Sequence, residues 1–259
     1  MKKDISDVAV TAKPKKKIYQ KWWFWVVVIV AGLGIVGSLG DDPDSNSTPK
    51  AGQDQAAPNT SAPQEPTTQA YSVELPSGNY TVGIDFPAGT YDIVAVSGGG
   101  NVSSDNAFSG GINAVMGTAD KNKNGITSYE QEYKNIKLPE DTVLRVSGGV
   151  VINISSDDAS TDELTPRNQT ITESVELGNG NFLAGKDFDA GVYDITVVSG
   201  GGNVSSDNIL SGGLNAVMGT ADKNNNGIGL YEQAYKNIDL PDGTTITISG
   251  VTISLSPSK

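Results

Sequence analysis

The sequence predicts an all-β fold, in which two tandem small domains of the β-sandwich or barrel type follow one transmembrane helix and a disordered stalk. Three observations lead to this prediction. Short runs alternate apolar and polar residues, as in Tyr193–Val197 and Thr245–Ser249, which is the period of a half-buried strand. Gly, Pro, Asn and Asp separate these runs at short intervals. A block of about 80 residues occurs twice, and this is a size that small β domains reach.

The first 21 residues form a basic segment that predicts a cytoplasmic terminus. They contain seven Lys and two Asp, whereas the whole chain carries a net charge of −12. The 18 residues Trp22–Leu39 that follow are uncharged and almost wholly apolar, and at ~1.5 Å per residue they span about 27 Å of hydrocarbon core. We therefore expect a transmembrane helix over residues 22–40. Basic residues mark the cytoplasmic side of such a helix, so the bulk of the chain is expected outside the cell.

A cleaved signal peptide is the alternative interpretation of this segment. Ser38 and Gly40 are small enough for a cleavage site. The long basic region and the length of the apolar run favour an uncleaved anchor in the cell membrane.

Two segments have the composition of linkers. Residues 41–70 are rich in Pro, Ser, Thr, Gln, Asp and Ala and contain no large apolar residue. Such a segment buries too little surface to offset its ordering entropy, so we expect a disordered stalk there. Residues 156–173 form a second, shorter linker with few apolar residues.

The internal repeat divides the rest of the chain. With an offset of 102, residues 74–147 align with residues 176–249, and Val96–Asn106 recurs unchanged as Val198–Asn208. We therefore expect two β domains, over residues 71–155 and 174–257. Within them, Gly250 predicts a hairpin or a bulge, the SGGGN segments predict loops, and Ile112–Met116 fits a short helical turn or a strand.

The opening of the first repeat resembles a small β module of exported Gram-positive surface proteins, among them those of lactobacilli, and the second repeat departs from this pattern over Leu183–Ala190. The resemblance rests on Gly78–Ile93, on Gly100-Asn101 and on the late strand pair in Leu240–Gly250. It covers residues 74–155 and 176–255, and Asp141 departs from the Gly of the pattern. The resemblance implies an extracellular location and a β architecture, and it brings no catalytic residues with it.

Two polar loops carry a candidate calcium site. ADKNKNG and ADKNNNG begin like an EF-hand loop, so a weak extracellular calcium site is one hypothesis. The expected position for the bidentate Glu holds Gln131 or Gln233. The competing interpretation is an Asn-Gly hairpin turn. The candidate side-chain ligands are Asp120, Asn122, Asn124, Asp222, Asn224 and Asn226.

Composition narrows the possible functions. The chain has no Cys and no His, which removes thiol chemistry, Cys/His zinc sites and His-activated nucleophiles. Its acidic body would be repelled by nucleic acid. The SGGGN segments lack the Lys of a phosphate-binding loop, and no carboxylate pair stands out as an acid and a base, so we expect no enzyme and no cofactor apart from the calcium hypothesis.

The functional hypotheses are therefore non-catalytic. The first is binding or adhesion to cell-wall glycan or to a protein partner. Tyr129 and Tyr133, with their counterparts Tyr231 and Tyr235, would stack on sugars if they were exposed and would belong to the core if they were buried. The alternative is a structural or envelope-stress component that acts by self-association, or a weakly calcium-dependent module.

Overall fold

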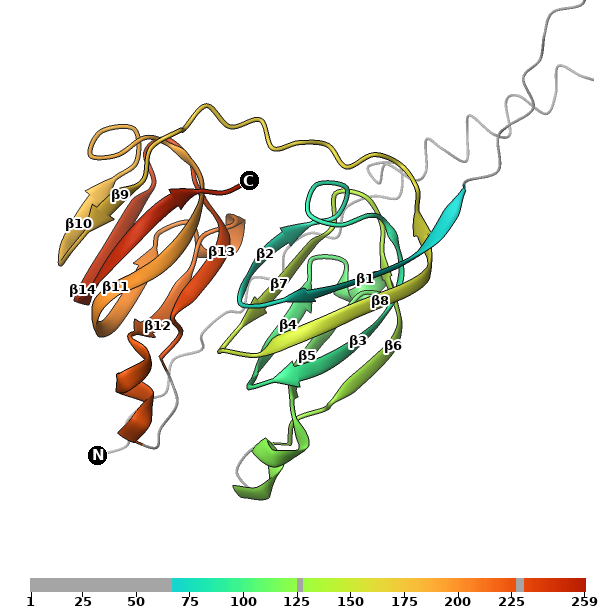
Figure 1. Ribbon diagram of the computed structural model, residues 1–259. Helices are drawn as coiled ribbons and strands as arrows, with labels where there is room; N and C mark the ends of the chain where they lie inside the picture. The colour runs from blue at the N-terminus through green and yellow to red at the C-terminus, as the bar shows by residue number, and fades with distance from the viewer. Residues whose placement is uncertain (1–66, 125–127, 227–230) are drawn as a thin grey trace, which may run out of the picture. The chain divides into compact units, whose positions relative to one another are not determined.

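The computed structural model describes residues 67–124, 128–226 and 231–259 (Figure 1). These residues form strands, turns and short 3-10 helices, which confirms the all-β prediction. No helix among them is long and apolar enough to cross a membrane. The predicted cytoplasmic segment, the transmembrane helix and the stalk as far as residue 66 lie outside the described residues.

The first repeat, here called repeat 1 (residues 68–160), contains eight strands in two antiparallel sheets. Their orders are β1-β8-β3-β6 and β2-β7-β4-β5. Eight strands wound alternately between two packed sheets in this order have the connectivity of a jelly roll. The strands are β1 (Thr68–Leu75), β2 (Gly78–Thr81), β3 (Gly89–Ser97), β4 (Gly99–Ser104), β5 (Asn113–Gly117), β6 (Glu132–Leu138), β7 (Val143–Ser147) and β8 (Val151–Ser160).

Repeat 2 (residues 175–257) reproduces this pairing with longer strands. Strand β11 corresponds to β3 and β4 together, and β14 corresponds to β7 and β8 together. Strands β9 and β10 both pair with β14, and β12 and β13 both pair with β11. The strands are β9 (Val175–Leu177), β10 (Gly180–Leu183), β11 (Gly191–Ser206), β12 (Asn215–Gly219), β13 (Ala234–Leu240) and β14 (Thr245–Pro257).

The SGGGN segments were predicted as loops, and this prediction is wrong. Strand β11 runs through Val198–Asn203 without a break, and β4 begins at Gly99. A Cβ on Gly202 would lie 1.8 Å from the carbonyl oxygen of Ser249, and one on Gly100 would lie 1.9 Å from that of Ser147. The glycines therefore let two backbones approach, between β3 and β4 in repeat 1 and at the register shift between β11 and β14 in repeat 2. Gly250 faces this corner at a register shift, so the predicted bulge is present there.

Each repeat has its own hydrophobic core, built from the inward side chains of its alternating strands. Tyr91 is fully buried in repeat 1, where its ring meets Phe86 edge to face at 5.5 Å. Its hydroxyl donates to the carbonyl of Pro87 at 2.6 Å, so this buried donor is satisfied. Tyr193 repeats the arrangement with the carbonyl of Asp189.

Two boundaries differ from those predicted. Strand β1 begins at Thr68, inside the predicted stalk, because residues 68–71 pair with the end of β8. Strand β8 continues to Ser160, inside the predicted linker. The segment Ile112–Met116 contains most of strand β5, so the strand is the correct one of its two predicted alternatives. A turn lies at Glu140-Asp141, as the Pro and Asp of Leu138–Asp141 predict, and Asp141 adopts the left-handed backbone that the matching Gly243 also has.

Candidate interaction surfaces

The two polar loops are 3-10 helices rather than hairpin turns. Residues Ala119–Asn124 form η3 and Ala221–Asn226 form η5. Each connects two strands that do not pair with each other: β5 with β6, and β12 with β13. The Asn-Gly hairpin interpretation is therefore wrong.

The middle candidate ligand of each loop holds the loop closed. The Asn122 amide donates to the carbonyl of Tyr129 at 2.8 Å, and its oxygen accepts the N–H of Tyr129 at 2.7 Å. Asn224 makes the same pair of bonds with Tyr231, at 2.8 and 3.0 Å. Since these side chains take the place of a backbone partner, their oxygens are already used by the fold.

The remaining candidate ligands give no cluster. Asp120 accepts a hydrogen bond from the Thr118 hydroxyl at 2.5 Å. A hydrogen bond from the Thr220 hydroxyl lowers the pKa of Asp222. The side chains of Asn124 and Asn226 lie outside the described residues. Over residues 67–124, 128–226 and 231–259, no three Asp or Glu side chains gather as a metal site would require.

The tyrosines do not form an aromatic groove in the part of the chain that the structure describes. Tyr129 lies against Gly99 and Gly117, where a Cβ on either glycine would lie 2.8 Å from its ring. Tyr231 lies in the same way against Gly201 and Gly219. These rings cover glycine backbone, which is a packing role. Tyr133 packs partly buried on the core of repeat 1, and Tyr235 is buried.

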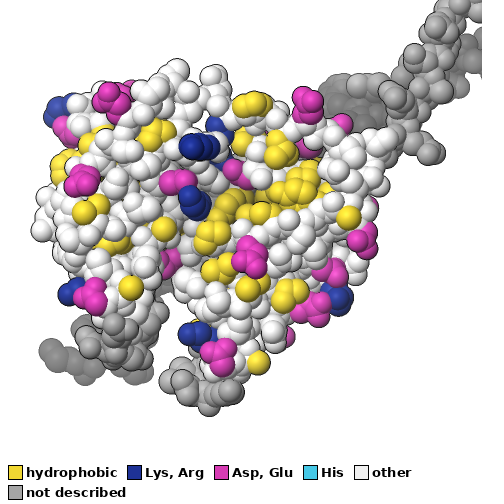
Figure 2. All heavy atoms as spheres, in the orientation of Figure 1, with side chains coloured by type: hydrophobic (Ala, Val, Ile, Leu, Met, Phe, Trp, Pro, Cys, Tyr) yellow, Lys and Arg dark blue, Asp and Glu magenta, His cyan; other side chains and the backbone are white. Residues whose placement is uncertain are grey.

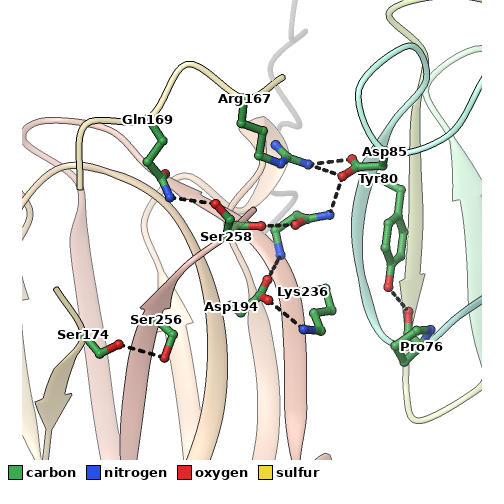
Figure 3. A network of polar contacts seen from close by, with 11 residues as sticks. Pro76, Tyr80, Asp85, Arg167, Gln169, Ser174, Asp194, Lys236, Ser256 and Ser258 are labelled. Carbon is green, nitrogen blue, oxygen red and sulfur yellow. Dashed lines mark hydrogen bonds and ion pairs between the residues drawn. The ribbon is translucent and has the colours of Figure 1, made fainter. Parts of the chain in front are cut away.

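A polar network joins the two repeats, and sequence analysis did not anticipate it. Arg167 of the linker donates from Nη2 to both carboxylate oxygens of Asp85, at 2.6 and 2.5 Å (Figure 3). Asp85 also accepts a hydrogen bond from the side-chain amide of Asn237 on β13, at 3.1 Å. The Ser258 hydroxyl in turn donates to the Asn237 oxygen. One carboxylate of repeat 1 is thus held by the linker and by repeat 2.

Strand β2 of repeat 1 lies against β13 of repeat 2 at the same junction. Gly78 pairs with Lys236 in parallel, and the Lys236 N–H donates to the carbonyl of Ser77 at 2.9 Å. The side-chain amide of Asn79 donates to the carbonyl of Gly212 at 2.8 Å. These contacts bury Asn79 and Tyr80 of β2.

Glu232 is a partly buried carboxylate at this junction. Its Oε1 accepts the N–H of Gly148 in repeat 1 at 3.1 Å. Burial raises the pKa of Glu232, and the hydrogen bond from the N–H of Gly148 works against that rise. Burial raises the pKa because it disfavours the charged form of an acid, and here it is the larger of the opposing effects.

The linker also crosses the end of repeat 2. The Gln169 side chain accepts the N–H of Val192 and donates to the carbonyl of Ser258, both at 2.9 Å. In repeat 1 the matching N–H, of Thr90, instead bonds to Asp158 of the same repeat at 3.1 Å.

Repeat 1 leaves open the surface that repeat 2 uses at the junction. Tyr133, Lys134 and Asn135 match Tyr235, Lys236 and Asn237, yet Lys134 and Asn135 are exposed whereas Asn237 is only 8% exposed. Beside Asn135 lies a polar hollow of about 350 Å³. Its lining is Thr90, Asp92, Asn135, Ser155, Ser156, Asp157 and Asp158.

Single large apolar side chains project from equivalent turns of the two repeats. Phe108 in η2 (Ala107–Ser109) is fully exposed, and Leu210 in η4 (Ile209–Ser211) is 90% exposed. Carboxylates, in contrast, are scattered over the face shown in Figure 2 and do not gather at one place. The exposed apolar turns are the clearest candidate contacts on the surface.

The contacts at the junction could not be predicted from the sequence. Asp85 looked like one polar turn residue among many, and Arg167 stood in a segment interpreted as a linker. The signal available was that Arg167 is one of only two arginines in the chain, the other being Arg145. Comparison with known proteins finds no match to this chain among family models, curated proteins or solved structures.

Proposed function

We propose that the chain is a single-pass surface protein of a Gram-positive cell that acts by non-catalytic binding to a protein partner. In this proposal the N-terminus is cytoplasmic, and residues 41–66 carry the two joined repeats away from the membrane. The basic segment followed by Trp22–Leu39 supports the anchor and its orientation. The all-β fold of the rest supports a rigid module for display.

The exposure of Phe108 and Leu210 is the observation that carries the choice of a protein partner. Phe108 and Leu210 occupy equivalent positions of the two repeats. The residue type differs, but both side chains are large, apolar and exposed to water. Large apolar side chains that are exposed at the same place in both repeats are available for burial by a partner protein. A glycan site would instead need aromatic faces that stack on sugars, and the tyrosines considered for that role pack on glycines or on the core. Phe108 is an exposed aromatic residue, but repeat 2 has Leu210 in its place, so the two repeats share an apolar side chain there and not an aromatic one.

A binding experiment with the full-length chain in detergent micelles tests this proposal. The probes are Gram-positive envelope fragments that retain their proteins and peptidoglycan sacculi stripped of protein. We expect retention on the first probe only, and a several-fold loss in the Phe108→Ser, Leu210→Ser double variant. Leu164→Ser, a change at a partly exposed apolar residue of the linker, is the matched control. Binding to stripped sacculi, or binding to neither probe, contradicts the proposal.

Self-association is a second candidate function, favoured by one specific observation. Repeat 1 and repeat 2 contact each other through surfaces that each of them carries, and one copy of each surface stays exposed. A chain in which both complementary surfaces of an interface remain exposed can bind a second copy of itself through them. Sedimentation of the full-length chain in micelles at increasing concentration tests this candidate, and a monomer at every concentration would remove it.

A further inference from the structure

We propose that chains associate head to tail, with β10 and the Asp187 loop of one chain docked on strand β6 of repeat 1 of a second chain. The inference rests on the self-association proposed above. It adds which surfaces meet and that they meet head to tail. The contact between the two repeats within one chain is its template.

Two faces make up that template. The loop face of repeat 1 consists of Gly78–Thr81 and Asp85, and the strand face of repeat 2 consists of Tyr235–Asn237. Their counterparts are a loop face in repeat 2, Gly180–Leu183 and Asp187, and a strand face in repeat 1, Tyr133–Asn135. Each repeat therefore has both faces, and the chain uses one of each internally.

The unused strand face has the same internal geometry as the used one. Asn135 donates its N–H to Asp92 at 3.0 Å, as Asn237 does to Asp194 at 3.1 Å. Both asparagines take the left-handed backbone, with φ of 57° and 56°. Lysine pairs with the same aspartate in each case, at 3.2 Å for Lys134 and 2.6 Å for Lys236. Asn135 thus presents its side-chain amide as Asn237 does when it meets Asp85.

The unused loop face is also preformed. Asp187 accepts the N–H of Leu183 at 2.8 Å, as Asp85 accepts that of Thr81 at 2.6 Å. Asp187 and Asn181 are exposed, whereas Asp85 is partly buried and Asn79 is buried by the junction. Gly78 permits close approach, since a Cβ there would lie 2.7 Å from the Cβ of Lys236. Glycine occupies the matching position 180 as well.

The contact within one chain and the proposed contact between two chains have different charged groups, and in each contact a cation would meet carboxylates. Arg167, which pairs with Asp85, belongs to the linker and has no counterpart in either repeat. Repeat 2 instead carries an exposed Lys186 where repeat 1 has Ile84. The hollow beside Asn135 contains Asp157 and Asp158. An ammonium group next to Asp187 would therefore meet carboxylates, which supports a second copy as the occupant.

One contact of the template cannot recur between chains. Glu232 accepts the N–H of Gly148, but the matching N–H of Gly250 already donates to Asn179 at 2.5 Å. The contact between chains should therefore be weaker than the contact within a chain. Because the two faces differ, the interface is heterologous, and repetition gives a ring or an open filament.

Cross-linking of single-cysteine chains tests the proposal, since the natural sequence has no cysteine. Full-length Lys134→Cys and Asn181→Cys chains, both changed at exposed residues, are mixed in micelles and treated with a short bismaleimide. We expect several-fold more heterodimer than with Lys121→Cys in place of Lys134→Cys. The Asn79→Cys, Lys236→Cys chain, which carries the matching pair within one molecule, serves as the positive control.

The outcomes separate this proposal from the one it rests on. Association in sedimentation without excess Lys134–Asn181 cross-linking overturns the head-to-tail arrangement and leaves self-association in place. A monomer at all concentrations overturns both. Lys186→Glu should weaken association several-fold, and Asp157→Lys in the same chain should restore part of it. Association that is indifferent to both changes also overturns the proposal.

Discussion

Arg167 and Asp85 form a buried ion pair in which one guanidinium nitrogen bonds to both carboxylate oxygens, at 2.6 and 2.5 Å. Each side chain is only 11% exposed. The same carboxylate accepts the N–H of Thr81 and the amide of Asn237. Asp187, its counterpart in repeat 2, keeps the local N–H bond but lies exposed. Asp85 therefore joins a loop of repeat 1 to the linker through Arg167 and to repeat 2 through Asn237.

Arg167→Ala should destabilise the folded chain by about 3 kcal/mol, because it leaves a buried carboxylate without its cation. Denaturant unfolding followed by far-UV circular dichroism measures the loss. Lys186→Ala, a change at an exposed lysine beside the matching aspartate, should cost less than about 0.5 kcal/mol. Equal effects of the two changes would show that the pair contributes no more than a surface charge.

The fold class could be predicted from the sequence because its cause is local. Alternation over runs such as Tyr193–Val197 reports which face of a strand is buried, and the internal repeat sets the period of the architecture. The turn at Asp141 was predictable for the same reason, since four consecutive residues determine it.

The corners and the junction could not be predicted because distant residues cause them. The glycines of SGGGN are typical of loops in the sequence, and only the structure shows that the backbone of Ser147 or Ser249 lies against them. The role of Asp85 depends on Arg167 and Asn237, which are 82 and 152 positions away in the sequence. Asn122 resembled a metal ligand because its hydrogen bonds to the backbone of Tyr129 cannot be predicted from the residue types in the loop.

Gly202→Ala should be among the most damaging single changes in repeat 2, at about 3 kcal/mol or more. Its Cβ would lie 1.8 Å from the backbone oxygen of Ser249, so one of two paired strands must move. Gly178→Ala is the control, because no atom lies within 4 Å of its added Cβ and its backbone is not left-handed. Thermal unfolding of both variants checks the contrast, and similar midpoints would contradict the close packing of the corner.

Asn122→Ala and Asn224→Ala should each cost about 1–2 kcal/mol, since each change leaves both the N–H and the carbonyl of a tyrosine without their protein partner. Asn181→Ala, at an exposed asparagine of β10, provides the comparison. Chemical denaturation gives the values. A loss no larger than that of Asn181→Ala would show that these side chains do not hold the loops.

Calcium at several millimolar should leave the thermal midpoint of the full-length chain unchanged. The oxygens of Asn122 and Asn224 are used by the backbone, and a weak site would need several carboxylates in addition. Addition of a chelator should likewise have no effect. A midpoint that rises with calcium and falls back on chelation would restore the calcium hypothesis.

Glu232→Gln should stabilise the chain at neutral pH, and its advantage should shrink as the pH falls. Burial raises the folded-state pKa of Glu232 above the ordinary value of 4.5. Between these two pKa values the folded state binds more protons than the unfolded state, so the stability contributed by this group falls as pH rises. Above the folded-state pKa the full penalty for a buried charge is present, and below 4.5 it is absent. Glutamine is neutral throughout and keeps an oxygen for the N–H of Gly148.

Glu130→Gln isolates this effect, because Glu130 occupies the matching position of repeat 1 and is exposed. Denaturant unfolding of the three proteins at several pH values between 4 and 7 gives the comparison. The wild-type chain and Glu130→Gln should change in parallel, since both retain the buried Glu232. The curve of Glu232→Gln should lie above them at pH 7 and approach them at the acid end. Curves that stay parallel for all three proteins would mean that Glu232 is solvated at the junction, and the contact between Glu232 and Gly148 would then be open to water.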